Sequence, residues 1–105
     1  VTLTPLTGIE EENQTDIYEN ALYAPLENPV SETAVINYSV ASQGTQVRIE
    51  IYDLAGRSVA VLRDNPETPG EHSLNWNTGE TPSGVYFCRM NAGEFTATRE
   101  IMVLR

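Results

Sequence analysis

The sequence predicts an all-β fold, a sandwich of six to seven antiparallel strands with an extended N-terminal arm. Three observations predict it. Apolar and polar residues alternate over several short runs, as in strands with one buried face. Clusters of Gly, Pro, Asn and Asp separate these runs at roughly 8–12 residue intervals. No stretch of the chain has the period of an amphipathic helix.

Residues 1–19 read as an acidic linker or N-terminal arm, and residues 20–105 as the sandwich. The arm carries Glu10-Glu11-Glu12 and few bulky apolar side chains, so charge repulsion keeps it extended. An apolar lead-in follows and adds a seventh, edge strand between Tyr18 and Leu26. It ends at Asn28-Pro29, where the residue before proline is held extended and sets the approach of the first full strand.

The clearest strand is "TQVRIEIYDL", residues 45–54. Val47, Ile49 and Ile51 are expected to face inward, while the alternate residues, Glu50 among them, face solvent. The turn at 53–56 suits a hairpin, because Asp53 can bond the turn amides and Gly56 can adopt a left-handed conformation. "RSVAVLRD" is its partner strand. Further strands are expected at residues 33–41, 70–77, 84–91 and 94–105, with a turn at Asn91-Ala92-Gly93.

Two local signals interrupt this pattern. Pro66 and Pro69 predict a long connection over residues 65–70 in which strand pairing stops. The last strand changes its alternation near Arg99-Glu100, so Phe95 lies on one face and Met102 on the other, which predicts a bulge.

The charge excludes several classes of partner. Fifteen acidic residues face six arginines, no lysine occurs, and the net charge is −9. Nucleic-acid binding depends on neutralising phosphates with basic side chains, so we expect no nucleic-acid partner. No apolar run is long enough to cross a bilayer, so we expect no membrane insertion. Val1 is expected to be an internal or processed start.

The sequence contains few residues in arrangements that could support catalysis or metal binding. The chain holds one cysteine, Cys88, and one histidine, His72, which are too few for a zinc site. They lie on different predicted strands, and nothing else in the sequence suggests a thiol nucleophile with its base. Asp53, Asp64 and Glu67 fall in predicted turns, where carboxylates ordinarily bond backbone amides. We therefore expect no enzyme activity, no catalytic residue, no metal and no cofactor. Cys88 and His72 are expected to be structural.

From residue 20 onward the sequence resembles a known family, the type A C-terminal sorting domains of the type IX (Por) secretion system. These are themselves similar to the Ig-like domain of the flagellar hook-capping protein. The segments that carry the resemblance are "LYAPLENP", "VRIEIYDLAGRSVAVL", "PGEHSLNWN", "SGVYFCRMNAG" and "REIMVLR".

The resemblance implies an Ig-like β-sandwich that is not catalytic and directs an exported protein to the cell surface. Its implied partner is the secretion translocon or the surface-attachment machinery. The implied location is the cell surface or the extracellular space, reached through the periplasm of a Gram-negative-type bacterium. The family's marks fall here on Asn28, Pro29, Asp53, Gly56, Arg57, Gly84, Tyr86, Arg99 and Arg105.

Two other functions stay open. A structural Ig-like subunit of an extracellular filament would assemble by donating an N-terminal strand to its neighbour. The donated residues would be Tyr18, Leu22, Tyr23 and Leu26. A carbohydrate-binding accessory module would use Trp76, Tyr52 and Tyr86 as a stacking platform, although a lone tryptophan on an inward face is more often core.

Overall fold

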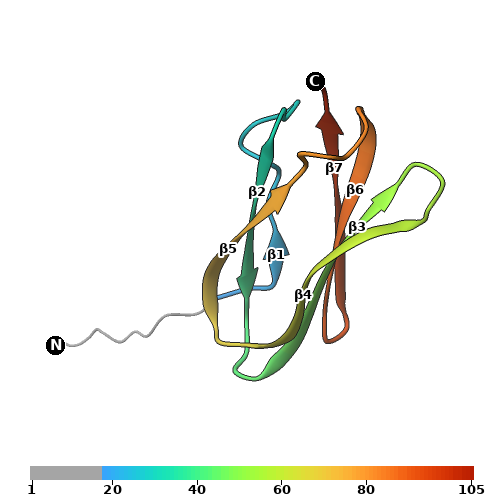
Figure 1. The fold of residues 1–105 in the computed structure, drawn as a ribbon. Helices are drawn as coiled ribbons and strands as arrows, with labels where there is room; N and C mark the ends of the chain where they lie inside the picture. The colour runs from blue at the N-terminus through green and yellow to red at the C-terminus, as the bar shows by residue number, and fades with distance from the viewer. Residues whose placement is uncertain (1–17) are drawn as a thin grey trace, which may run out of the picture.

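The computed structural model describes residues 18–105, which form seven strands in two antiparallel sheets (Figure 1). The strands are β1 (Ala21–Leu22), β2 (Thr33–Val40), β3 (Thr45–Asp53), β4 (Ser58–Glu67), β5 (Gly70–Asn77), β6 (Gly84–Ala92) and β7 (Phe95–Val103). One sheet has the order β1-β2-β5 and the other β4-β3-β6-β7. The prediction of an Ig-like β-sandwich is confirmed.

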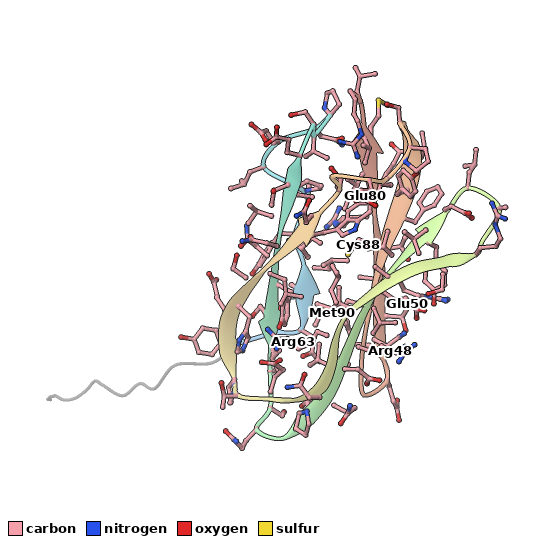
Figure 2. The ribbon with its side chains drawn as sticks, viewed as in Figure 1. Arg48, Glu50, Arg63, Glu80, Cys88 and Met90 are labelled. Carbon is pink, nitrogen blue, oxygen red and sulfur yellow. The ribbon has the colours of Figure 1, made fainter. Side chains whose placement is uncertain are left out.

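The core lies between the two sheets and follows the predicted alternation. Val47, Ile49 and Ile51 of β3 are fully buried, and Trp76 of β5 is only 4% exposed. Cys88 and Met90 of β6 project from the four-stranded sheet into the space between the layers (Figure 2). Burial of this apolar surface is the main stabilising contribution available to the domain, because Cys88 is a free thiol and forms no disulfide.

The lead-in forms the expected seventh strand, though a short one. Ala21 pairs with Ser39, and Leu22 pairs with Tyr38, so β1 adds to the edge of β2. Leu22 is 2% exposed and belongs to the core cluster. The lead-in therefore folds back onto its own sandwich, where it covers the edge of β2.

The expected break at residues 65–70 is wrong. β4 continues to Glu67, with Pro66 opposite Gln46, and only Thr68 and Pro69 separate it from β5. β4 is the outer strand of its sheet, and an edge strand tolerates a proline whose missing N–H would point away from the ladder. The short connection carries the chain from one sheet to the other.

The expected bulge in the last strand is also wrong. β6 and β7 pair without a register shift from Gly84 opposite Val103 to Ala92 opposite Phe95. Arg99 simply occupies one inward position of β7, two residues before the buried Ile101. The bulges lie instead between β3 and β4, at Ile49/Glu50 and at Ile51/Tyr52.

The β6–β7 hairpin turns over two residues, Gly93 and Glu94, one position later than predicted. Gly93 has a φ of 63°. The favoured two-residue hairpin turns require a positive φ at the first turn position, because their twist then matches that of the flanking strands. Within residues 18–105 no helix is long and apolar enough to span a membrane.

Candidate functional site

One aspartate, Asp53, holds the β3–β4 turn together through its hydrogen bonds. Asp53 Oδ1 accepts hydrogen bonds from the backbone N–H groups of Ala55 (3.0 Å) and Arg57 (2.9 Å). Its Oδ2 accepts one from Arg57 Nε at 2.9 Å. These backbone and guanidinium donors hold the pKa of the Asp53 carboxyl below its usual value. Gly56 has a φ of 85°, which the tight return of the chain requires.

A second carboxylate fixes the base of the same hairpin, and the sequence analysis did not anticipate it. Glu50 was expected to face solvent, but it is 7% exposed. It accepts hydrogen bonds from Ser58 Oγ (2.5 Å), Tyr52 Oη (2.8 Å) and Arg48 Nε (3.0 Å). These donors, Ser58 foremost, lower the pKa of Glu50 to about 2.

The position of Glu50 explains its burial. It lies on the outer face of the four-stranded sheet, between the two bulges where β4 bends relative to β3 (Figure 2). Arg48 also reaches Asp64 on β4 at 2.7 Å, so the network spans both strands of the hairpin. The alternation of β3 places Glu50 on this face correctly, but only the neighbouring strand supplies the side chains that cover it.

The loop before β6 is held by a tyrosine. Tyr86 Oη donates to the carbonyl of Pro82 at 2.7 Å. Its ring packs edge-on against Trp76, with centroids 5.5 Å apart and planes at 70°. Tyr86 therefore joins the core to the loop that lies opposite the β3–β4 turn.

A groove of about 650 Å³ separates this loop from the hairpin. Its lining consists of two segments, residues 53–59 on the hairpin side and residues 80–86 on the loop side. Four predicted marks of the family meet here, namely Asp53, Arg57, Gly84 and Tyr86. We name it the hairpin groove.

The hairpin groove offers an apolar surface with the Asp53–Arg57 ion pair on one side and Glu80 on the other. Leu54 is 73% exposed and Val59 is 41% exposed. The side chain of Arg57 is 81% exposed although its Nε is paired with Asp53, and Glu80 lies on the opposite wall. Exposed aliphatic groups beside a fixed guanidinium are features of protein contact surfaces, not of a reaction centre.

The Asn28-Pro29 segment lies outside the groove and holds the end of β7. Asn28 Oδ1 accepts a hydrogen bond from the N–H of Met102 at 2.9 Å. Val30, just beyond Pro29, donates to the carbonyl of Met102 and accepts from the N–H of Leu104. The Asn-Pro segment thus pairs with the outer edge of β7 and covers it.

Arg105 connects this end of the molecule to the groove. Its guanidinium donates to the carbonyls of Ser31 (2.7 Å) and Thr81 (3.0 Å from Nε). Thr81 is part of the groove wall. Arg105 therefore positions the wall from the far side, while Arg99 lies away from it, beside β1.

The four residues of the predicted strand-donation arm lie in different environments. Leu22 is a core residue, whereas Tyr23 is 42% exposed and Leu26 is 84% exposed. Tyr18 lies over Gly70, whose added Cβ would be 3.9 Å from the Tyr18 ring. The structure brings Leu22 into the chain's own β-sheet, so donating this strand to a neighbour would first require its removal from the core.

The predicted stacking platform does not form. Trp76 and Tyr86 are buried against each other between the sheets, whereas Tyr52 lies on the outer face and bonds Glu50. His72 is half-buried, and its ring stacks on Tyr38 with centroids 5.2 Å apart. Burial raises the pKa of the Cys88 thiol to about 12. Residues 18–105 contain no group of three metal-ligating side chains.

The chain belongs to the family of secretion system C-terminal sorting domains, whose pattern matches residues 27–104. This confirms the resemblance to type IX sorting domains and makes the chain a secretion-targeting module for export to the cell surface or beyond. Such a domain is a sorting signal and not a catalyst.

Two solved structures share the fold. CopC from Methylosinus trichosporium OB3b is 16% identical, with a TM-score of 0.54 over 81% of this chain and 93% of its own. Dimeric latent PorU from Porphyromonas gingivalis is 18% identical, with a TM-score of 0.56. That alignment covers 97% of this chain but only 10% of the PorU chain. Among curated proteins, none matches the sequence.

Proposed function

We propose that residues 20–105 form one folding unit that directs a protein joined to its N-terminal side to the cell surface, and that residues 1–19 are a linker. On this proposal the hairpin groove is where the secretion or surface-attachment machinery docks. The single observation that supports it is that four predicted family marks, from two segments far apart in the chain, line one groove.

The contacts favour recognition of a protein at this groove. The polar atoms of Asp53 and Tyr86 form hydrogen bonds that hold the two walls of the groove in place. These residues therefore shape the groove and do not offer free polar groups to a partner. Leu54, Val59 and Arg57 remain exposed and are the side chains a partner would cover. Arginine is enriched among the residues that contribute most to binding, which lie near the centre of an interface, while surrounding aliphatic side chains exclude water from it.

A secretion assay tests the proposal. A reporter is fused upstream of residue 20, and its surface level is compared between the native module and a Leu54→Asp, Arg57→Glu double variant. Both side chains are exposed, so the module should still fold, while surface display should fall at least tenfold. The matched control is Leu26→Asp, at a leucine outside the groove that is also largely exposed. Undiminished display of the double variant would refute docking at the groove.

A deletion tests sorting itself. Removing the chain from Glu94 onward deletes β7, and with it the whole β6–β7 ladder, so display should be abolished. Retained display would refute the sorting function. The filament alternative predicts polymers of the isolated chain on size-exclusion chromatography, but no contact in residues 18–105 favours it over a monomer, and the buried Leu22 weighs against it.

A further inference from the structure

A second groove lies on the outer face of the three-stranded sheet. Leu22 of β1 and Tyr38 of β2 are paired and point into the core. Side chains alternate along strands, so the neighbouring Tyr23 and Asn37 point outward, and Ser73 lies opposite Asn37 on β5. Tyr23 is held in line with this row, because its N–H donates to the carbonyl of Asn37 at 3.0 Å.

These side chains line a groove of about 610 Å³, within the usual range for small-molecule sites. Its apolar wall comes from the lead-in, residues 23–26, and its polar floor comes from Asn37, Ser73 and Glu71. We name it the outer groove. It shares no residue with the hairpin groove.

Four polar side chains that line the outer groove have no partner within the described part of the protein, whereas His72, which also lines it, contacts the Thr68 carbonyl and the Glu67 carboxylate. Among residues 18–105, the side chains of Tyr23, Asn37, Ser73 and Glu71 make no hydrogen bond or ion pair with protein atoms. Together they present an amide and two hydroxyls, which both donate and accept, and a carboxylate, which accepts. This arrangement contrasts with the hairpin groove, where the polar atoms hold the walls together.

The distribution of charged residues around the outer groove favours a neutral ligand over an anionic one. All six arginines lie on β3, β4, β6 and β7 or in the segments that follow β3 and β7, and none lies on β1, β2 or β5. An anionic ligand such as a phosphate would meet the Glu71 carboxylate with no arginine on these strands, and His72, which also lines the groove, already contacts the Glu67 carboxylate. A neutral polyol suits the groove better, because its hydroxyls both donate and accept, and its C–H faces pack on an aromatic ring whose face is electron-rich.

We propose that the outer groove binds a neutral oligosaccharide, with the Tyr23 ring against one sugar face and Asn37, Ser73 and Glu71 bonding its hydroxyls. This site is independent of the sorting function and of the buried aromatic pair. The groove is open and offers few polar groups, so the dissociation constant is expected to be about 1 mM. Charge plays little part in the contact, so the affinity is expected to be insensitive to salt.

Nuclear magnetic resonance titration of the full chain tests the proposal. The probes are cellohexaose, laminarihexaose, maltohexaose and chitohexaose, each raised to about 10 mM. At least one should give saturable shifts centred on Tyr23, Asn37 and Ser73, unchanged between about 0.05 M and 0.5 M salt. Absence of saturable shifts with all four, or shifts centred elsewhere, overturns the proposal.

Variants identify the groups responsible. Tyr23→Ala and Asn37→Ala should each weaken binding at least tenfold, whereas Tyr23→Phe, which keeps the ring, should weaken it less than threefold. The amide spectrum of each variant verifies that it is folded. Leu54→Ala in the hairpin groove should leave sugar binding unchanged and impair sorting, and Tyr23→Ala should do the reverse. Unaltered sugar binding by Tyr23→Ala overturns the assignment without bearing on sorting.

Discussion

Arg99 Nε donates a hydrogen bond to the main-chain carbonyl of Leu22 at 2.8 Å, and this contact joins β7 of one sheet to β1 of the other. Only two residues of β1 pair with β2, so the short strand depends on contacts from outside its own sheet. The arginine lies on the inward face of β7 and supplies one such contact at the rim of the core. Sheets of a sandwich are otherwise held by side-chain packing alone.

Arg99→Met should therefore loosen β1. The substitution keeps an apolar stem but leaves the Leu22 carbonyl without its charged donor, which is expected to lower the free energy of unfolding by about 1 kcal/mol. Urea denaturation measures this change. Hydrogen exchange at Tyr23 N–H, which bonds Asn37, should also accelerate. Arg89→Met is the control, because the Arg89 guanidinium lies on the outer face of the sheet, 5.9 Å from the centre of the Tyr52 ring. Equal effects of the two variants would contradict the role given to Arg99.

Glu50 should make stability depend on acid pH. Its pKa is about 2 in the folded protein and 4.5 ordinarily, so the folded state favours the charged form. The stabilisation is complete above pH 4.5 and is lost as the pH falls toward 2, amounting to roughly 2–3 kcal/mol.

Glu50→Gln should abolish this part of the pH dependence and destabilise the domain at neutral pH. The measurement is the urea midpoint of both proteins between about pH 2 and pH 7. Glu100→Gln, on the exposed face of β7, should retain the native profile. A Glu50→Gln variant that loses stability on acidification as steeply as the native chain would show that other groups are responsible.

Tyr86→Phe should weaken the loop wall of the hairpin groove without disturbing the core. The ring stays against Trp76, but the 2.7 Å bond to the Pro82 carbonyl is lost, at a cost of about 1 kcal/mol. Thermal unfolding measures the loss, and the surface-display assay should show a reduced signal. Tyr23→Phe, at an exposed tyrosine outside this groove, should change neither. Unreduced display by Tyr86→Phe would mean that docking does not require the ordered loop.

Cys88 should be protected from thiol reagents while the domain is folded. The thiol is 1% exposed, and with a pKa near 12 the thiolate fraction at neutral pH is on the order of 10⁻⁵. Labelling with a chromogenic disulfide should therefore require opening of the sandwich and should be immediate in denaturant. Arg99→Met should label about five times faster than the native chain, matching its loss of stability. Rapid labelling of the native protein would be inconsistent with the packing of β6.

The alternation of apolar and polar residues along the sequence was sufficient to predict most strands and the buried face of each. The alternation of β3 identifies Val47, Ile49 and Ile51 as core, and the Asp53 to Gly56 turn identifies the hairpin, because these properties depend on neighbours in sequence. Where a position depends on the partner strand, the same reasoning was wrong. Pro66 pairs because β4 happens to be an edge, and Arg99 needs no bulge because β1 lies within its reach.

The candidate sites divide in the same way. The motif residues could be named from the sequence, but Asp53 and Tyr86 are 33 positions apart, and no pattern shows that they line one groove. The burial of Glu50 by Ser58, and the outward row of Tyr23, Asn37 and Ser73, also require the strand order. The chain alone determined which residues prefer extended structure and which side of each strand is apolar. The tertiary structure decided which strands became edges and which polar groups met, because those outcomes depend on contacts between residues far apart in the chain.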